Sequence, residues 1–321
     1  MATPSSTFTE IVTTTLRRHP HVIADNVSNH NALYNRMRKR GKLKTIASGG
    51  YEIVAPLDYA ENATYQRYSG FDTLNIGSSN VLTAAKFDWV QAAVNVVASG
   101  RELRMNSGKE QMIDLAKARL KNAMRTAANN MSVDLYSSGA LSNQMGGLAH
   151  IIQTAGTGTV GGINSSTFSF WQNQKLELAD SDAWTSATIT GDMHTMWLSC
   201  VRGTDKPDLI IGTHDFYSAY WESRNDLQRY RSEDMPDTFE TIKFQSADVV
   251  HDSNSNFSTT GERFYFINSD YLELVCHKDA DWKTLDEKSS VNQDAVVIPI
   301  IFQGQLTVSN RNLQGIIIDA S

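Results

Sequence analysis

The most regular pattern of hydrophobic and polar residues runs from residue 110 to residue 135. Apolar side chains recur every three or four residues, at Ile113, Ala116, Leu120, Ala123, Met124, Ala127, Met131 and Leu135. That spacing places them on one face of an α-helix. The preceding Ser107-Gly108-Lys109-Glu110 matches a capping box, in which serine and glutamate side chains bond the first amides of a helix. The pattern predicts one long helix within residues 107–138, roughly 40 Å from end to end.

Residues 45–80 carry strand-forming side chains around a polar centre rich in tyrosine. Pro56 favours an edge strand, because proline donates no ladder hydrogen bond. The segment predicts a long β-hairpin that projects from the body. Because two strands alone are barely stable and tyrosine is common at interfaces, we expect the hairpin to rest on a neighbouring subunit, the alternative being a meander packed on its own core. The candidate subunit-contact residues are Tyr59, Tyr65, Arg67, Tyr68 and Phe71.

Residues 1–44 are interpreted as an N-terminal arm with a short helix near Phe8–Leu16 and a second helix around Leu33 and Met37. Residues 1–45 hold eight basic and two acidic residues, while the whole chain has a net charge of −6. A basic arm on an acidic body favours docking to nucleic acid or to an acidic protein face; the alternative is a solvated helix. The candidate arm contacts are Arg36, Arg38, Lys39 and Arg40.

Residues 140–290 have the mixed pattern of an α/β unit. Helices are expected to begin within 168–178, over 191–202 and at 213 or 214, and strands over 208–212, 242–251 and 264–267. The C-terminal part predicts strands over 295–302 and 305–309 and a last strand at Ile316–Ile318. These elements, added to the long helix and the hairpin, predict an α+β protein.

The segment from Gly146 to Gln174 is rich in glycine and contains the sequence GTGTVGG at 156–162. A phosphate-binding P-loop needs a lysine after its last glycine, and a dinucleotide fold needs the spacing GxGxxG after a strand. Both features are missing here, so a nucleotide site is disfavoured. A sharp turn out of the long helix, with Phe168, Phe170 and Trp171 packed at the entry to the next unit, fits the sequence better.

The remaining residues predict no catalytic, metal or cofactor site. The eight histidines are scattered, without an HExxH motif or a spaced Cys/His pair, and no GxSxG sequence is present. Cys200 and Cys276 fit no zinc spacing and suggest no disulfide framework. The longest apolar run, Ala295–Phe302, is too short to span a membrane. We therefore expect neither an enzyme nor a membrane partner.

The order of elements resembles the major capsid proteins of tailed bacteriophages, which have the Hong Kong 97 fold. That order is basic arm, projecting hairpin, long helix, Gly-rich turn, α/β unit and terminal strands. Gly146-Gly147-Leu148 followed by GTVGGINSSTFSFWQNQ at 158–174 looks like the segment that such capsid proteins carry after the spine helix. The resemblance implies an N-terminal arm at 1–44 and an extended loop at 45–83. It also implies a peripheral domain at 84–144 and 291–321, with the spine helix at 107–138, and an axial domain at 145–290.

The resemblance further implies a shell protein of the virion that assembles in the host cytoplasm. Copies of the chain are expected to form hexamers and pentamers and then an icosahedral capsid around double-stranded DNA, which they contact nonspecifically. A separate scaffold protein, a portal and a decoration protein are the other implied partners.

One departure from the family pattern is that residues 45–80 contain no lysine, whereas cross-linking members use a lysine of the extended loop. The resemblance therefore implies a shell held by noncovalent contacts. Two alternatives stay open at this point. One is an encapsulin-like nanocompartment with an enzyme cargo, and the other is a nucleotide-dependent enzyme that uses the Gly-rich loop 156–162.

Overall fold

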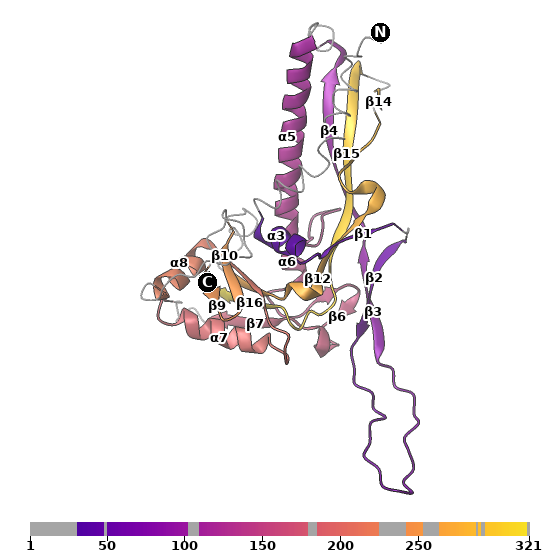
Figure 1. Cartoon of the computed structure of the whole chain (residues 1–321), viewed down its shortest axis with the longest axis vertical. Helices are drawn as coiled ribbons and strands as arrows, with labels where there is room; N and C mark the ends of the chain where they lie inside the picture. Colours follow the sequence, from indigo (N-terminus) through magenta and orange to yellow (C-terminus); the bar gives the residue numbers. More distant parts are fainter. Residues whose placement is uncertain are drawn as a thin grey trace.

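The computed structural model describes residues 31–47, 50–101, 109–178, 185–224, 242–252, 263–286, 288–289 and 293–319. The helix expected near residues 8–16 and the proposed helix cap at Ser107 lie outside these ranges. The chain has an elongated part, in which a long helix lies alongside long strands, and a second lobe to one side (Figure 1). A thin hairpin projects from the opposite end of the elongated part.

The long helix α5 spans Lys109–Leu135, as the apolar periodicity predicts. It packs on strand β4 (Val90–Ser99), which pairs antiparallel with β15 (Ala295–Val308). The buried residues of this contact are Val96, Ala98, Leu120, Ala123, Met124, Ala127, Ile298 and Ile300. Small alanines on the helix let it lie close to the sheet, so the helix and the two strands share one apolar contact.

Within the described ranges, the first sheet has six strands arranged around β15. Its other members are β1 (Leu43–Ile46), β12 (Leu272–His277), β13 (Lys283–Thr284) and β14 (Lys288–Ser289), with β4 as described. We expected two strands over residues 295–309, and that expectation is wrong. Gly304 stays in the ladder, opposite Cys276 on one side and Val90 on the other, so β15 continues through it.

The second sheet also has six strands among the residues that the structure describes, in the order β7-β16-β11-β8-β10-β9. Their bounds are β7 (Gln174–Leu178), β16 (Gly315–Asp319), β11 (Arg263–Ile267), β8 (Leu209–Gly212), β10 (Ala247–His251) and β9 (Ile242–Phe244). Helices α7 (Ile189–Ser199) and α8 (His214–Ser223) pack against this sheet (Figure 1). Both helices and the buried strands β8 and β11 were expected from the sequence.

Two expectations for this region are wrong. No α-helix opens within 168–178: a 3-10 turn, η1 (Ser169–Trp171), leads into β7, which pairs in parallel with β16. The strand expected over 242–251 is interrupted at Gln245, whose φ is 54°, so β9 and β10 form a tight hairpin. Strand β16 belongs to the second sheet and β12 to the first, and the expected domain boundaries stay a prediction.

Helix α3 (Ala32–Lys39) corresponds to the second helix expected in the arm, and it is part of the body. Its cap Asn31 accepts a hydrogen bond from the Tyr34 amide at 2.9 Å. Ala32, Leu33 and Met37 are fully buried in the main apolar core. The described residues 31–44 therefore pack on the body of the same chain. The remaining short elements are α6 (Leu148–Ile151), β5 (Thr159–Val160), β6 (Ile163–Asn164), η2 (Ser269–Tyr271) and η3 (Lys278–Ala280).

Candidate interaction surfaces

The projecting hairpin is built from β2 (Glu52–Asp58) and β3 (Leu82–Asp88), which pair antiparallel. This confirms the expected hairpin, although the return strand begins at Leu82 and Ile46 belongs to β1. Pro56 lies opposite Ala84. The hydrogen bonds of the loop 60–80 that involve side chains lie within the loop, for example Gln66 Nε2 to the Thr73 carbonyl at 2.9 Å. The loop therefore stands clear of the body (Figure 1).

The tip of the hairpin, residues 65–76, exposes large apolar side chains. Tyr65 is 82% exposed, Phe71 is fully exposed and Ile76 is 94% exposed. Tyr68 and Arg67 are exposed too. Sequence reasoning selected four of these five and missed Ile76, as it missed the exposed Leu74. A contiguous group of exposed apolar residues on a projecting element marks a protein interaction site, so the tip is the first candidate surface.

Tyr59 has a different environment from the other hairpin candidates. Its ring packs on Phe170 of the same chain, with ring centroids 5.2 Å apart, and Phe170 in turn lies against Phe168 and Trp171. Tyr59 therefore helps to join the base of the hairpin to the body. Its role as a contact to another subunit stays a prediction beside this intrachain contact.

The glycines at 156–162 form a turn that braces the hairpin. Gly161 and Gly162 have φ of 59° and 75° and join β5 to β6, which is the geometry of a two-residue type I′ hairpin turn. The Gly161 carbonyl accepts the Lys86 amide at 2.9 Å. The Gly158 amide donates to Ser165 Oγ at 2.9 Å, and the Gly156 amide donates to the Gln153 carbonyl at 2.9 Å. These amides are engaged within the chain, whereas a phosphate cradle requires free ones.

Replacing Gly161 by alanine is expected to destabilise the chain more than the same change at Gly162. Both positions are left-handed, which costs an alanine roughly 1–2 kcal/mol. A Cβ on Gly161 would also lie 2.8 Å from the Ala85 Cβ and 3.1 Å from the Phe87 ring, while Gly162 faces open space. Crowding of that kind costs about 1–3 kcal/mol more. Urea unfolding of the two variants measures the difference, and equal losses would contradict the bracing contact.

Arg311 holds the Gly-rich segment in place by hydrogen bonds from a buried position. Its guanidinium is fully buried and donates to four neutral acceptors at 2.5–3.2 Å. These acceptors are the Ile151 carbonyl, Ser165 Oγ, the Trp171 carbonyl and Asn173 Oδ1. Burial lowers the pKa of Arg311 to about 10, so it keeps its charge at neutral pH. Sequence reasoning missed this residue, which lies about 140 residues from the segment that it holds.

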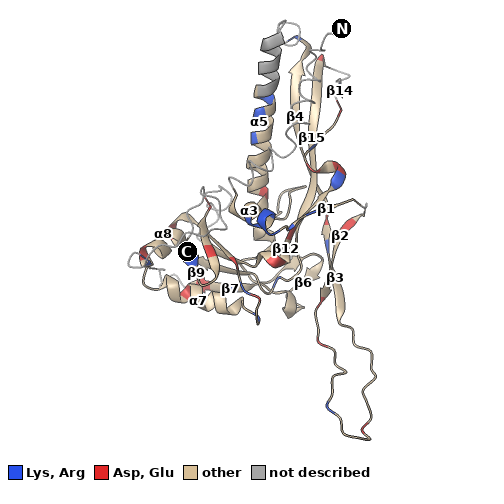
Figure 2. Ribbon diagram, viewed as in Figure 1, with Lys and Arg blue, Asp and Glu red and all other residues tan. Residues whose placement is uncertain are grey.

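Helix α3 and its C-cap Arg40 carry one buried arginine and three exposed cations. Arg36 is 4% exposed and contacts two carboxylates, Asp248 through Nη2 and Asp208 through Nε at 3.4 Å. Its expected contact with DNA or scaffold is therefore wrong, because the side chain joins α3 to the second sheet. Arg38 and Lys39 are exposed, and Arg40 is partly exposed beside Asp208 and Asp270. Figure 2 shows further cations along α5, where Lys121 and Arg125 are exposed.

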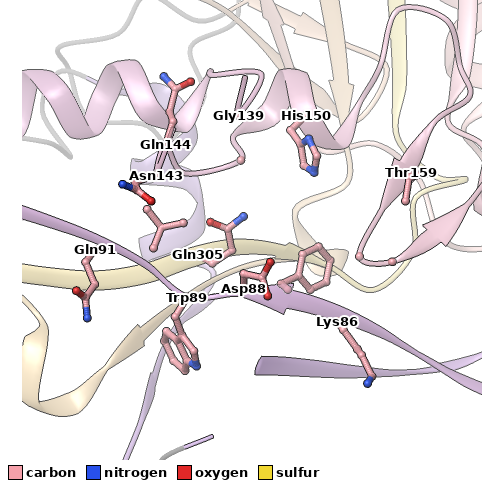
Figure 3. A pocket seen from close by; sticks show the side chains of 15 residues that line it. Lys86, Asp88, Trp89, Gln91, Gly139, Asn143, Gln144, His150, Thr159 and Gln305 are labelled. Carbon is pink, nitrogen blue, oxygen red and sulfur yellow. The ribbon is translucent and has the colours of Figure 1, made fainter. Parts of the chain in front are cut away.

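A hollow of about 700 Å³ lies where the hairpin meets the body. We call it the elbow groove and define it by Asp88, Trp89, Asn143, His150, Thr159 and Gln305. Trp89 anchors its rim by donating from Nε1 to the Gly50 carbonyl at 3.0 Å. Figure 3 shows the turn 139–146 and His150 on one side of the groove, with β3 and the start of β4 on the other. The lining is mainly polar, which makes the groove the second candidate surface.

The groove residue His150 is expected to make stability depend on pH. Its burial, followed by the nearby charge of Arg311, lowers its pKa from the ordinary 6.5, while a hydrogen bond with the Ser138 backbone opposes the shift. The unfolded chain takes up this proton more readily than the folded chain, so stability is lost as pH falls below about 6.5 and through the lowered folded pKa. The urea midpoint of His150→Gln should fall less between pH 7.5 and pH 5 than that of the wild type. Equal falls would contradict this account.

The described part of the chain holds no group of three or more His, Cys, Asp or Glu side chains placed to bind a metal ion. Cys200 and Cys276 are free and buried, and burial raises the pKa of each thiol to about 12. They are therefore poor nucleophiles at neutral pH. Within the same ranges, no helix combines the length and the apolar character that crossing a membrane requires.

No protein-family model matches the sequence, and no curated protein matches it. Solved structures do match. The capsid asymmetric unit of cyanophage A-1(L) has a TM-score of 0.61 at 16% identity, over 88% of this chain and 92% of that one. This chain has a phage capsid fold. The capsid of cyanophage P-SCSP1u matches at 0.56 and 11% identity, over 87% and 86% of the two chains, and the capsid of a native GTA particle at 0.56 and 11%, over 88% and 89%.

The capsid fold confirms the α+β, Hong Kong 97-like class expected from the sequence. Each matched structure covers most of both chains, so the likeness is one of overall fold. Of the sequence candidates, the fold brings Tyr65, Arg67, Tyr68 and Phe71 together at the hairpin tip. It separates these residues from the cations of α3, which lie on the body (Figure 2).

Proposed function

We propose that this chain is the major capsid protein of a tailed bacteriophage. Copies assemble through hexamers and pentamers into an icosahedral shell around double-stranded DNA. The observation that carries the proposal is the match to capsid structures over nearly nine tenths of the chain, at TM-scores up to 0.61. The exposed apolar hairpin tip supports it, because such a surface needs a partner to cover it.

The mechanism is assembly by repeated contacts between identical chains. A tip on one copy that contacts a different surface on the next gives a head-to-tail interface, which closes into a ring when the rotation fits. Many modest contacts then act together, so that a closed shell is far more stable than any one pair. Since residues 45–80 contain no lysine, the contacts are noncovalent. Each copy acts as a structural unit without catalytic activity.

The capsid domains follow the two sheets. The first sheet and α5 form the peripheral domain, with α5 as the spine helix, and β2, β3 and their loop form the extended loop. The second sheet with α7 and α8 forms the axial domain at the centre of each capsomer. The N-terminal arm expected at 1–44 lies mostly outside the described residues. The exposed cations Arg38, Lys39 and Arg40 form the face of α3 that would meet scaffold and later make nonspecific contacts with DNA phosphates.

The other partners follow from the same role. A separate scaffold protein guides assembly in the host cytoplasm, a portal occupies one vertex and a decoration protein binds the finished shell. The rival that shares this fold is an encapsulin-like nanocompartment with an enzyme cargo. The nucleotide-dependent enzyme is disfavoured because the amides of Gly156 and Gly158 are already bonded within the chain.

The packaged material distinguishes these functions. Particles purified from producing cells are treated with DNase and then opened, and their contents are analysed for nucleic acid and protein. A capsid protein is expected to protect double-stranded DNA of uniform length. A single enzyme in place of DNA would indicate a nanocompartment. Soluble chains that bind ATP or NAD, with binding lost in Gly158→Ala, would indicate the enzyme and overturn the proposal.

A further inference from the structure

Two histidines lie at the carboxyl ends of two parallel strands in the second sheet. His251 is the last residue of β10 and lies opposite Gly212, the last residue of β8. His214 follows two residues after Gly212 and is the first residue of α8, which packs on β10 (Figure 1). In open α/β sheets, ligands bind outside the carboxyl ends of the parallel strands. The pairing of β8 with β10 therefore holds both histidines at an edge suited to a ligand.

The two imidazole rings have the separation that a shared metal ion requires. The ring centroids of His214 and His251 are 5.5 Å apart, and the ring planes are inclined at 71°. An imidazole nitrogen binds Zn²⁺ at about 2.0–2.1 Å, which puts each ring centroid about 3.2 Å from the ion. Two rings at the tetrahedral angle then have centroids about 5.2 Å apart. The torsion that turns each ring has a broad preference, so both rings can direct a nitrogen at one ion without movement of the backbone.

The nitrogens of both rings are available to a ligand. Among the described residues, neither imidazole makes a hydrogen bond, and their contacts are those between rings. Burial, followed by the nearby charge of His214, lowers the pKa of His251, while Asp252 opposes the shift. A neutral imidazole carries a lone pair on one nitrogen, and this is the form that binds metal ions. His251 is therefore in its metal-binding form at neutral pH.

The first turn of α8 is held firmly in place, so the two ligands are positioned in advance. Phe216 of α8 is buried and stacks on the buried Phe264 of β11, with ring centroids 4.9 Å apart. Tyr217 packs on the His251 ring at 5.9 Å and limits its orientation. Ligands fixed by packing on helices and strands make the more precise metal sites. His214 is exposed and His251 is partly exposed, so an ion can enter from solvent.

We propose that His214 and His251 together bind one divalent transition-metal ion of the class that prefers imidazole nitrogen, such as Zn²⁺ or Cu²⁺. Imidazole suits these ions, whereas Mg²⁺ and Ca²⁺ prefer oxygen. The buried carboxylate of Asp252, which accepts a hydrogen bond from the Tyr136 hydroxyl at 2.5 Å, adds negative charge beside the pair. Water or a ligand from another molecule completes the coordination. The bound ion joins the start of α8 to β10, and this inference does not rest on the proposed function.

Calorimetric titration of the untagged full chain with Zn²⁺, after removal of bound metal by a chelator, tests the site. The wild type is expected to bind one ion per chain. His214→Gln and His251→Gln should each weaken binding at least about tenfold, because even a change in a group that only orients a metal ligand costs roughly 10–100-fold. The matched control is His194→Gln, which removes an exposed histidine of α7 and should bind as the wild type does. Mg²⁺ should give no binding at this site.

A chemical footprint covers variants that fold poorly, because it uses the wild type alone. Diethyl pyrocarbonate modifies free imidazole nitrogens, and mass spectrometry of the peptides locates each modified residue. Zn²⁺ is expected to protect His214 and His251 and to leave His194 reactive. The proposal would be overturned by a lack of saturable binding, by binding that both glutamine variants retain, or by equal modification of the pair with and without Zn²⁺. Equal protection of His194 would mean an adventitious ion only and would overturn it too.

Discussion

A chain whose residues 60–80 are replaced by a short Gly-Ser connector is expected to fold normally and to form no shell. The cut leaves the β2–β3 ladder, the Tyr59–Phe170 contact and the bond from the Tyr59 amide to the Val81 carbonyl in place. Shortening a surface loop changes the free energy of unfolding by only about 1 kcal/mol. Assembly should disappear, because the exposed tip is gone. Urea unfolding measures the first effect, and sedimentation with electron microscopy measures the second.

A full-length variant separates the chemistry of the tip from its length. Serine replaces the exposed apolar residues Tyr65, Tyr68, Phe71, Leu74 and Ile76, and the hydrogen bonds made by Gln66 within the loop are retained. This variant should also remain unassembled if the apolar surface drives the contact. Normal particles from both variants would show that the hairpin tip has no part in assembly.

The second large effect is expected from Arg36→Leu. Arg36 is buried beside Asp248 and Asp208, and Asp208 also accepts bonds from the Ser269 amide and hydroxyl, both at 2.7 Å. Removing the arginine leaves buried carboxylate charge without its counter-ion, which costs roughly 3–5 kcal/mol. Lys39→Leu on the exposed side of the same helix is the matched control and should change stability by less than about 0.5 kcal/mol.

Urea unfolding followed by tryptophan fluorescence compares the two variants. A fall in the free energy of unfolding for Arg36→Leu, with no fall for Lys39→Leu, is the expected result. Similar values for both would mean that Arg36 does not hold α3 against the second sheet, and its earlier interpretation as a contact for DNA or scaffold would be open again.

Local patterns explain which parts of the fold were predictable. The helix α5 follows from an apolar period sustained over many turns, and α7, α8 and β8 follow from shorter but regular runs. The errors arise where pairing over long sequence distance decides the outcome. Residues 174–178 become a strand because β16, some 140 residues later, lies beside them. Arg36 is buried because it contacts Asp208 and Asp248. These residues lie 172 and 212 positions away in the sequence, so no local pattern reveals the contact.

The two candidate surfaces differ in the same respect, because local sequence predicts one of them and not the other. The hairpin tip was predictable because a polar loop that keeps tyrosines and a phenylalanine is unusual for a solvated turn. The elbow groove was not, since it joins residues from the end of β3, the turn after α5 and the middle of β15. The one signal for it in the sequence is Gln305, a polar residue in a long apolar strand, and only its burial without a partner gives that signal meaning.

The most direct test of the central claim is a cryo-electron microscopy reconstruction of the particles that the chain forms when it is produced with its scaffold protein. The account predicts a closed icosahedral shell built from hexamers and pentamers. In each copy, the hairpin should lie on the neighbouring copy and α5 should lie in the shell wall. A chain that stays monomeric under these conditions, or that forms only a small enzyme-like oligomer, would contradict it.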